Sequence, residues 1–432
     1  MTRCYYGMYP ISVLMVSTEY PPMPGGVGRY TRNLTLALKK LGIDVYIACN
    51  ERGEGNFFGL DASNKENSRT LLRIVNQISP DLVHIQLEHG LYGLNLGSIK
   101  KFRMQTNIDQ FYAKCQTPIV TTFHSAYPIE QWVNLVRSNH LTKFRLLDLP
   151  IELSSLALKY GNRMLTYELF NRANREKMLR SAASIAFSEY MAKMLSTSSY
   201  KVNVIYHGAE PSLMNQPTKE VARSHYSLPL DRRIALALGF ATHTKGWEIL
   251  KEMKIPDNWT ILVNHSRNHY SNESEVSNSL PLNNNSGVED HHQNSHGLFE
   301  LNHGFLPDDA LSLLFYASDT VIMPYSVVAG SGVMFDALAH GLPFVASDLG
   351  FFKEFARKGL GIAVKRKPFE FSEALKMLEN DYPHYKKEVE RFKNNLNWDS
   401  VAKQHIEIYL RVLAKSHEHR SFAPEAMRRK IL

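Results

Sequence analysis

The feature that most constrains the fold is an alternation of short apolar, β-branched runs with stretches of helical period, and it occurs twice along the chain. The apolar run 11–17 precedes a stretch at 27–41 whose apolar residues recur at helical spacing, and Gly42 ends that stretch. Runs such as 233–240 alternate with helical stretches in the same way in the second half. Continuous apolar strands alternating with helices predict a parallel sheet covered on both faces. We therefore expect an α/β protein of two doubly wound, Rossmann-like domains that face each other across a cleft.

The length of 432 residues favours two hydrophobic cores over one. We expect an N-terminal domain over 1–210 with a helical insertion at about 130–181 and a C-terminal domain over 211–395 with a mobile polar insertion at 264–302. A helical region at 396–415 and a basic tail at 416–432 follow. The 264–302 segment is rich in Asn, Ser and His, so it has too little apolar surface to offset its ordering entropy. Its histidines lack a fixed metal-ligand spacing, which favours a solvated loop over a metal site.

Charge and cysteine content narrow the classes of partner. The 50 Lys and Arg exceed the 42 Asp and Glu by 8, an excess that suits an anionic small ligand or an anionic membrane surface. No basic run is interleaved with aromatic residues, which argues against nucleic-acid binding. The 3 cysteines form no CxxC pair, as is usual in a reducing compartment. With no signal-peptide pattern at the start, we expect a cytoplasmic protein, with peripheral contact at the inner face of a membrane left open.

A glycine-rich loop follows the first apolar run and leads into the first helical stretch. Gly25, Gly26 and Gly28 allow a ligand to approach the backbone, and a helix N-terminus offers N–H groups to an anion. A dinucleotide-binding fingerprint would place another glycine where Thr31 stands, so a nicotinamide site is disfavoured. A purely structural glycine turn remains the alternative.

Two further residues stand at the ends of predicted strands. His124 follows the run 118–123, where a histidine can donate hydrogen bonds to a hydroxyl-rich or anionic ligand. Lys245 precedes Gly246 and a new helical stretch, a position from which an ammonium group reaches a phosphate. A single histidine is more often structural and a single lysine more often solvated, so neither residue decides the function alone.

The segment 324–348 contains the second glycine-rich helix start. Gly330, Ser331 and Gly332 predict a bare helix N-terminus suited to phosphate oxygens. Asp336 follows one turn later among apolar residues, where a carboxylate is costly without a partner. A ligand diol would provide two hydroxyl donors, and nearby backbone is the structural alternative. Two helix N-termini, Lys245 and Asp336 together predict a site for a nucleoside diphosphate.

These motifs resemble those of the retaining GT-B glycosyltransferases of the family-four (group 1) type. The resemblance rests on "EYPPMPGGVGRYTRNLTLALKKLGIDV" near the start and on "SGVMFDALAHGLPFVASD" in the second half. It implies transfer of a hexose-type sugar from a nucleotide diphosphate-sugar to an acceptor hydroxyl with retention of configuration. It also implies no metal or other cofactor, and a saccharide, lipid-linked or small-molecule acceptor in polysaccharide or glycolipid biosynthesis. By the same resemblance, the helix at 396–415 crosses back to the N-terminal domain.

The resemblance also implies roles for individual residues. By it, His124 contacts the transferred sugar and Lys245 binds the diphosphate as the two catalytic residues. The remaining donor-binding positions are Gly25 and Gly26 near the diphosphate and the acceptor, Gly330, Ser331 and Gly332 at the phosphates, Asp336 at the ribose, and Phe305 and Leu306 beside the nucleobase.

Three positions depart from the family pattern. Val328 stands where the family has the glutamate that holds the donor sugar, so a hydrogen bond worth about 1.5–3 kcal/mol is missing or supplied elsewhere. Asp336 is shorter than the family's second glutamate, and Phe240 replaces an arginine that binds the diphosphate. These departures keep open a nucleotide-sugar-binding or scaffold protein that has lost the chemistry. A third interpretation is a GT-B-like sugar-nucleotide epimerase. Such an enzyme would need a pair of carboxylates in the cleft, and the sequence shows none.

Overall fold

The computed structural model describes residues 5–6, 9–94, 105–138, 155–213, 215–266, 292–294, 297–301 and 304–421. These residues form two compact units. The first unit lies within Met1–Ala126, Leu146–Gly208 and Trp398–Leu432, and the second lies within Tyr127–Arg145 and Ala209–Asn397. Each unit has its own sheet and its own hydrophobic core.

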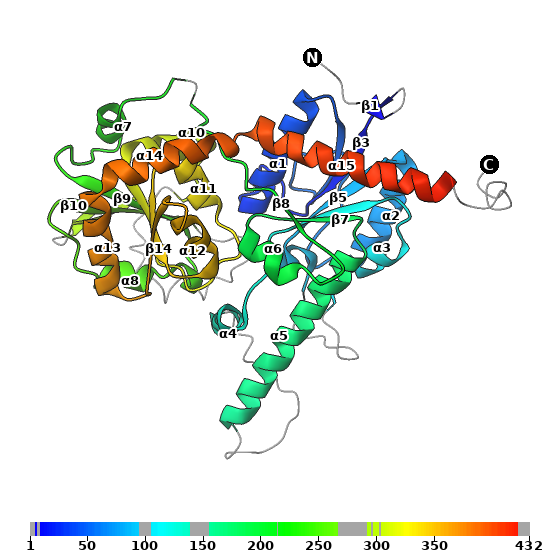
Figure 1. The fold of residues 1–432 in the computed structure, drawn as a ribbon, viewed down its shortest axis with the longest axis horizontal. Helices are drawn as coiled ribbons and strands as arrows, with labels where there is room; N and C mark the ends of the chain where they lie inside the picture. The colour runs from blue at the N-terminus through cyan, green and yellow to red at the C-terminus, as the bar shows by residue number, and fades with distance from the viewer. Residues whose placement is uncertain are drawn as a thin grey trace. The chain divides into compact units, whose positions relative to one another are not determined.

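The first unit is built on a parallel sheet of six strands in the order β4-β3-β5-β6-β7-β8 (Figure 1). The strands are β3 (Ser12–Val16), β4 (Asp44–Ala48), β5 (Leu82–Leu87), β6 (Ile119–Phe123), β7 (Ala183–Ala186) and β8 (Asn203–Val204). Every residue of β5, β6 and β7 is buried, as continuous apolar runs predict for a sheet covered on both faces. A short antiparallel pair, β1 (Tyr5–Tyr6) and β2 (Tyr9–Pro10), precedes this sheet in the chain.

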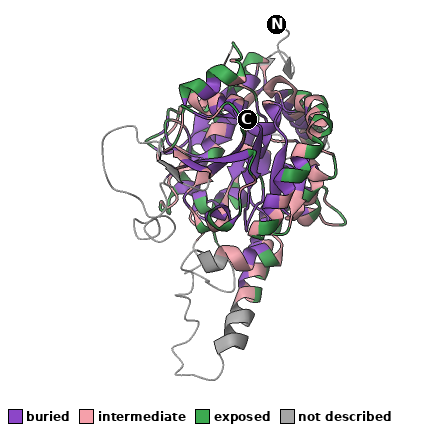
Figure 2. Ribbon diagram, turned by 90° about the vertical axis from the view of Figure 1, so that its left-hand side faces the viewer, coloured by how far each residue is buried: buried purple, intermediate pink, exposed green. Residues whose placement is uncertain are grey.

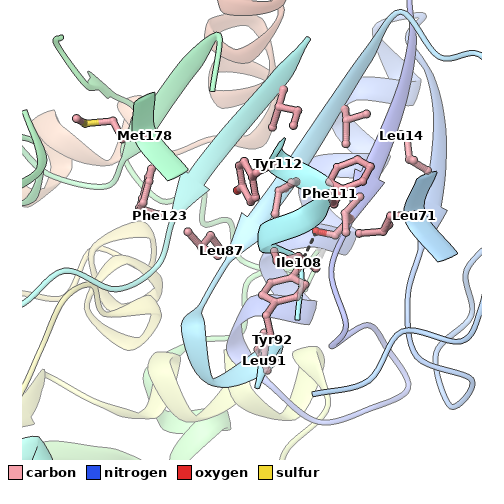
Figure 3. Close-up of a cluster of buried hydrophobic side chains, with 14 of the residues drawn as sticks. Leu14, Leu71, Leu87, Leu91, Tyr92, Ile108, Phe111, Tyr112, Phe123 and Met178 are labelled. Carbon is pink, nitrogen blue, oxygen red and sulfur yellow. Dashed lines mark hydrogen bonds between the residues drawn. The ribbon is translucent and has the colours of Figure 1, made fainter. Parts of the chain in front are cut away.

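The first unit also contains α-helices and one 3₁₀ turn. They are α1 (Gly26–Lys40), α2 (Asn67–Ile78), the 3₁₀ turn η1 (His89–Tyr92), α3 (Asp109–Lys114), α5 (Ser155–Leu179), α6 (Glu189–Leu195) and α15 (Trp398–Ser421). Helix α5 extends away from the sheet (Figure 1). Gly42, with φ of 86°, follows α1 in the left-handed conformation that a helix end favours. Leu14, Leu71, Phe111 and other apolar side chains from strands and helices meet in one buried cluster (Figure 3).

Helix α15 packs against α1, although more than 350 residues of sequence separate them (Figure 1). Its first residue, Trp398, lies over Gly208, where a Cβ atom would come within 2.5 Å of the indole ring. Tyr409 is fully buried within the unit. The helix continues to Ser421, so the predicted start of a basic tail at residue 416 is wrong; residues 422–432 lie outside the described part.

The second unit contains a seven-stranded sheet in the order β11-β12-β10-β9-β13-β14-β15, in which only β11 is antiparallel to its neighbour. The strands are β9 (Arg233–Phe240), β10 (Trp259–Ser266), β11 (His292–Asn294), β12 (Leu298–Leu301), β13 (Thr320–Met323), β14 (Phe344–Ser347) and β15 (Gly361–Val364). The interpretation of 264–302 as one mobile insertion is therefore wrong at both ends of the segment. Its first residues belong to β10, and its last residues form β11 and β12. Buried Leu298, Phe299 and Leu301 explain the error, because they form an apolar run at the end of a segment that is polar over most of its length. Residues 267–291 lie outside the described part.

The helices of the second unit are α4 (Ile129–Ser138), α7 (Lys219–His225), η3 (His243–Lys245), α8 (Trp247–Glu252), α10 (Asp308–Ala317), α11 (Gly332–Ala339), α12 (Gly350–Ala356), α13 (Pro368–Asn380), α14 (Tyr382–Phe392) and η4 (Lys393–Asn395). Within each unit most strand residues are buried, and the exposed residues lie on the outer faces of the helices and in loops (Figure 2). Helix α4 belongs to the segment expected as an insertion of the N-terminal domain, yet it groups with the second unit and contacts η3.

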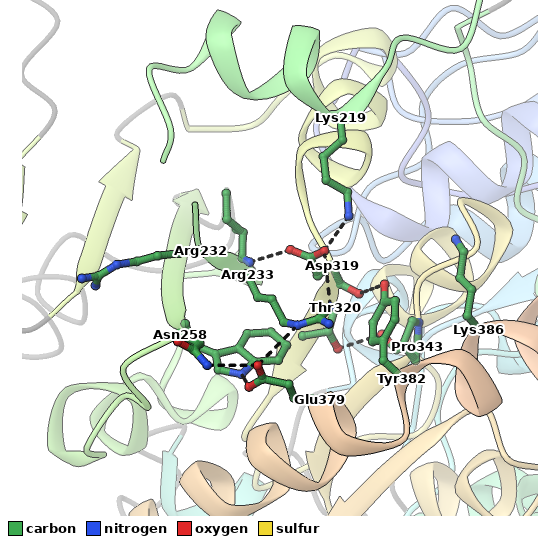
Figure 4. Close-up of polar contacts among 12 residues, drawn as sticks. Lys219, Arg232, Arg233, Asn258, Asp319, Thr320, Pro343, Glu379, Tyr382 and Lys386 are labelled. Carbon is green, nitrogen blue, oxygen red and sulfur yellow. Dashed lines mark hydrogen bonds and ion pairs between the residues drawn. The ribbon is translucent and has the colours of Figure 1, made fainter. Parts of the chain in front are cut away.

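A buried ion-pair network holds the amino-terminal edge of the second sheet (Figure 4). Asp319 directly precedes β13 and accepts hydrogen bonds from Arg223 at 2.7 Å and from the backbone N–H of Ile234 at 2.7 Å. Lys219 adds an ion pair at 2.5 Å. This network therefore joins α7, β9 and β13 at the edge opposite the carboxyl ends of the strands.

The described helices were also compared with the requirements of a membrane span. None of them is both long enough and apolar enough to cross a lipid bilayer.

Candidate functional site

The candidate residues all follow the carboxyl ends of parallel strands. In the first unit, Gly25 and Gly26 follow β3 and His124 follows β6. In the second unit, Lys245 follows β9, Phe305 and Leu306 follow β12, and the segment 330–336 follows β13. Ligands of open parallel sheets bind at this edge. The topology of each unit therefore brings its share of the candidates to the edge where a ligand is expected.

In the first unit, a carboxylate that sequence reasoning missed organises the glycine-rich loop. Glu19 is buried, and its Oε1 accepts a hydrogen bond from the backbone N–H of Gly28 at 2.7 Å. Burial raises the pKa of Glu19 to about 7, although the hydrogen bonds from the amides of Gly28 and Val27 oppose this rise. The prediction that the N-terminus of α1 offers free N–H groups to an anion is therefore corrected for Val27 and Gly28, whose amides already bond to Glu19.

The two adjacent glycines of this loop have different surroundings. A Cβ atom on Gly25 would overlap the carboxyl group of Glu19, whereas one on Gly26 would have no neighbour within 4 Å. Gly26 is exposed at the first position of α1. Gly25 is thus required by the packing of Glu19, and Gly26 is the glycine that leaves open space at the helix start.

His124 is half-buried at the end of β6, between aromatic rings. Its ring meets the ring of Tyr30 edge-on, with centroids 5.4 Å apart, and that of Phe187 at 4.9 Å. Burial, with a further contribution from His207, lowers the pKa of His124 to about 3, so the imidazole is neutral near pH 7. Its Nε2 atom is 3.0 Å from Oε1 of Gln86, a residue of β5.

In the second unit, Lys245 lies on the face of an aromatic ring. Its Nζ atom is 3.8 Å from the centroid of the Tyr325 ring, within the range of a cation–π contact. Burial lowers the pKa of Lys245 to about 8, and no carboxylate among the described residues forms an ion pair with it. Tyr325, which sequence reasoning did not select, is buried two residues after β13 and donates a hydrogen bond to the carbonyl oxygen of Leu238 at 3.2 Å.

The loop that carries Lys245 is tied to the loop after β13. Gly246, with φ of 73°, packs so closely on the carbonyl oxygen of Pro324 that a Cβ atom would overlap it. The backbone N–H of Ser326 donates to the carbonyl oxygen of Thr244 at 2.9 Å. The guanidinium group of Arg366, another residue that sequence reasoning missed, donates to the same Pro324 oxygen at 3.0 Å and pairs with Glu248. These contacts fix Lys245 relative to the N-terminus of α11.

The N-terminus of α11 is partly capped by its own chain. The hydroxyl group of Ser331 accepts a hydrogen bond from the backbone N–H of Met334 at 3.2 Å. The hydroxyl group of Ser331 in turn donates to the sulfur of Met323 at 3.6 Å, and the predicted bare helix start is corrected in this respect. The amides of Gly332 and Val333 precede Met334 in the first turn, where helical amides have no partner within the helix.

Asp336 is buried on α11, with 3% of its surface exposed. The prediction that it faces inward is therefore confirmed, whereas its role toward a ribose remains a prediction. The carbonyl oxygen of Asp336 lies 2.6 Å from Nδ1 of His340, which fixes the C-terminal turn of the helix.

Phe305 and Leu306, the residues predicted beside the nucleobase, follow β12. In the sheet, β10 lies between β12 and β9, the strand that precedes Lys245. The side chain of Phe305 is 48% exposed. Leu306 beside it is half-buried.

Val328 and Phe240, two of the three positions that depart from the family pattern, have partners of other kinds. The backbone N–H of Val328 donates to Oε1 of Gln131 on α4 at 2.7 Å, and both residues are buried. The carbonyl oxygen of Phe240 accepts a hydrogen bond from the indole N–H of Trp247 at 3.2 Å. Among the described residues, no three His, Cys, Asp or Glu side chains are grouped as metal ligands.

The chain was compared with known families and structures. Residues 24–213 match the model of glycosyltransferase family 4. No curated protein matches the chain. The solved structures similar to it include sucrose-phosphate synthase from Thermosynechococcus elongatus, with a TM-score of 0.65, 15% identity, and coverage of 94% of this chain and 100% of that chain.

Two other similar structures contain nucleotides. The catalytic domain of starch synthase IV from Arabidopsis thaliana, bound to ADP and acarbose, has a TM-score of 0.57 and 14% identity over 94% of this chain and 99% of that chain. UDP-GlcNAc 2-epimerase from Neisseria meningitidis, bound to UDP-GlcNAc, has a TM-score of 0.52 and 13% identity over 93% of this chain and 100% of that chain. The chain therefore has the GT-B fold, and the match to the glycosyltransferase family 4 model is confined to residues 24–213.

Proposed function

We propose that the protein is a glycosyltransferase that moves a hexose-type sugar from a nucleoside diphosphate-sugar to an acceptor hydroxyl group with retention of configuration. The observation that carries this proposal is the position of Lys245. Its ammonium group lies at the carboxyl edge of the second sheet, is desolvated, and forms no ion pair with a described carboxylate. Even a half-buried cation without a counterion is costly, and a diphosphate would offset that cost.

The neighbours of Lys245 support a diphosphate ligand. The first-turn amides of Gly332 and Val333 and the positive end of the α11 dipole favour a negative charge. Tyr325 lies in the loop between β13 and α11 and contacts Lys245 through its ring, so the cation is held against the loop that leads into this helix start. In this proposal the diphosphate is the leaving group, and Lys245 with these amides stabilises the charge that develops on it.

The other residues take roles that follow from this placement. Asp336 binds the ribose diol, and Phe305 with Leu306 contacts the nucleobase. Gly25 and Gly26 allow the donor diphosphate and the acceptor to approach, and His124 orients the transferred sugar. We propose that the reaction uses no metal, that the acceptor is a saccharide, a lipid-linked sugar or a small molecule, and that the protein works in the cytoplasm, with peripheral membrane contact as an option.

The test compares Lys245→Met with Lys358→Met. Lys358 also lies over an aromatic ring, with Nζ 5.3 Å from the Phe355 centroid, but it precedes β15 at the opposite edge of the sheet. UDP-, GDP- and ADP-glucose are first screened by thermal shift. Release of the nucleoside diphosphate from the stabilising donor is then measured with and without simple sugar acceptors.

The expected result follows from the strength of a charged hydrogen bond. We expect Lys245→Met to bind and turn over the donor at least about tenfold less well, because such a bond is worth roughly 1.5–3 kcal/mol. Lys358→Met should match the wild type. Equal activity in Lys245→Met and the wild type would remove the proposed role of Lys245.

One second function is favoured by a specific observation. Val328 and Phe240 stand where the family pattern has two polar side chains. Both side chains are apolar, so neither can make the hydrogen bonds of the residue that it replaces. A nucleotide-sugar-binding or scaffold protein would bind the donor without consuming it. Calorimetric titration separates the two functions, because an enzyme slowly hydrolyses the bound donor whereas a binding protein only retains it. Analysis of the released sugar also detects an epimerase, whose product has an inverted hydroxyl group.

A further inference from the structure

A chain of buried hydrogen bonds links α15 to His124 within the first unit. Tyr409 of α15 contacts Nδ1 of His84 at 2.7 Å, and Nε2 of His84 lies 3.3 Å from the amide nitrogen of Gln86. Oε1 of Gln86 lies 3.0 Å from Nε2 of His124. Tyr409, His84 and Gln86 are fully buried, so these contacts are shielded from water. His124 is therefore held by a polar network that begins at Tyr409 on α15 and runs through His84 and Gln86 of β5.

The orientation of the Gln86 amide follows from its neighbour Met15. The amide nitrogen of Gln86 is 3.2 Å from the sulfur of Met15. A thioether sulfur has no proton to donate, so the opposite orientation would place two acceptors against each other. The nitrogen must therefore face Met15 and His84, and the oxygen must face His124.

This orientation determines where the proton of His124 lies. The pKa of His124 is lowered to about 3, so the ring is neutral and carries one proton. The amide oxygen of Gln86 only accepts, so the proton must be on Nε2. Nδ1 then carries a lone pair, and no described residue hydrogen-bonds this atom.

The same reasoning is consistent along the rest of the network. Nε2 of His84 accepts a hydrogen bond from the Gln86 amide and lies 2.8 Å from the hydroxyl group of Thr122. The proton of His84 is therefore on Nδ1, which donates it in a hydrogen bond to Tyr409. Burial holds the pKa of His84 well below its usual value, which keeps this ring neutral as well. Tyr30 contacts two histidines beside this network. Its ring meets that of His124 edge-on, and its hydroxyl group lies 3.3 Å from Nε2 of His405.

We propose that Gln86 is a positioning residue that fixes His124 as its Nε2–H tautomer, so that His124 presents Nδ1 as a hydrogen-bond acceptor to a hydroxyl group of the bound sugar. The proposal rests on the proposed function for the identity of the ligand, and it deepens that function by assigning the direction of the hydrogen bond. It reverses the donor role that sequence reasoning assigned to His124. An acceptor nitrogen binds a neutral hydroxyl group and repels an anion, so His124 serves the sugar and the phosphates are left to the second unit.

The experiment reads the tautomer directly, without any substrate. Nitrogen-15 NMR of histidine-labelled protein distinguishes a protonated from an unprotonated ring nitrogen, and the spectrum of His124→Asn assigns the His124 signals. We expect protonated Nε2 and unprotonated Nδ1 in the wild type from pH 5 to 8. A protonated Nδ1 in the wild type would overturn the proposal.

Three variants then test the role of Gln86. Gln86→Met keeps the length of the side chain but removes the acceptor, and we expect a mixture of both tautomers and a loss of turnover of about tenfold. Gln86→Glu keeps an acceptor oxygen, so the Nε2–H tautomer should persist, while the added negative charge raises the pKa of His124 above about 3. Activity of this variant should then fall at acid pH as Nδ1 becomes protonated. Gln116→Met, at an exposed position of the same unit, is the control that should change none of these quantities.

The outcomes separate this proposal from the proposed function. An unchanged single tautomer in Gln86→Met overturns the role of Gln86, whether or not the protein binds a sugar nucleotide. The expected tautomers together with a failure of every donor to bind would instead overturn the proposed function. If Gln86→Met does not fold, the wild-type spectrum and Gln86→Glu still decide the question.

Discussion

The carboxyl group of Glu19 occupies the space that a Cβ atom on Gly25 would need. The same group accepts a hydrogen bond from the backbone N–H of Gly28 and so holds the first turn of α1. The glycine-rich loop therefore has two separate requirements. Gly25 makes room for a side chain of its own unit, whereas Gly26 faces open space.

This difference predicts opposite effects for two adjacent substitutions. Gly25→Ala should lower the free energy of unfolding by about 1–3 kcal/mol, because Glu19 must move and lose its hydrogen bond. Gly26→Ala should change the free energy of unfolding by less than about 0.5 kcal/mol, because its Cβ meets no atom. Urea unfolding of the two variants measures both quantities, and equal losses would contradict the packing of Glu19 against Gly25.

Glu19 also predicts a pH dependence of stability. Burial raises its pKa from 4.5 to about 7, so the folded protein holds the proton more tightly than the unfolded chain does. The stability that this proton contributes is present below pH 4.5 and is lost as the pH rises through about 7. Glu19→Gln stays uncharged, so its stability relative to the wild type should rise by at most about 3 kcal/mol over this interval. Thermal unfolding of both proteins at pH 4, 5, 6, 7 and 8 is the measurement, and parallel curves would exclude the raised pKa.

The lowered pKa of Lys245 predicts how donor binding depends on pH. Burial lowers this pKa to about 8, so the ammonium group is charged at pH 7 and largely neutral at pH 9. If Lys245 binds the diphosphate, the affinity for the nucleoside diphosphate should fall as the pH rises through about 8. Lys245→Arg keeps its charge at every pH and should show no such fall. Calorimetric titration at pH 7, 8 and 9 tests this, and the same slope in both proteins would exclude Lys245 as the titrating group.

Much of the fold could be predicted from the sequence because its signals are local. The run 11–17 contains β3, and the helical spacing over 27–41 corresponds closely to α1, which ends before Gly42. Strand and helix periods are properties of neighbouring residues, and a parallel sheet follows from their alternation. The same topology places every candidate residue at the carboxyl edge of a sheet, so the location of the candidates was also predictable.

The side-chain partners in the site were not predictable, because they depend on residues far apart in the sequence. Gln86 contacts His124 from another strand, and Tyr409 reaches His84 from a position 325 residues later. Tyr325 lies near Lys245 only because β9 and β13 are neighbours in the sheet. Local patterns identify residues at strand ends, but they do not identify which of these residues touch.

The hydrogen bond between Gln131 and Val328 predicts a local effect in the loop after β13. Gln131→Leu would leave the buried N–H group of Val328 without its acceptor, a loss of about 1–3 kcal/mol. Hydrogen exchange at the Val328 amide should accelerate in this variant. The amide of Ser326 in the same loop bonds to Thr244 instead and should exchange at the wild-type rate. Unchanged exchange at Val328 would show that Gln131 does not protect this amide.

The ion-pair network around Asp319 predicts two losses of stability of different size. Arg223 and Asp319 are both buried, so Arg223→Met leaves a buried carboxylate with fewer partners and should lower the free energy of unfolding by about 3–5 kcal/mol. The Lys219 side chain is 39% exposed, so Lys219→Met should cost about 1 kcal/mol or less. Both residues lie away from the carboxyl edge of the sheet, so the folded fraction of each variant should bind the sugar nucleotide with wild-type affinity. Urea unfolding ranks the two variants, and an equal or reversed order would show that burial does not set the strength of these pairs.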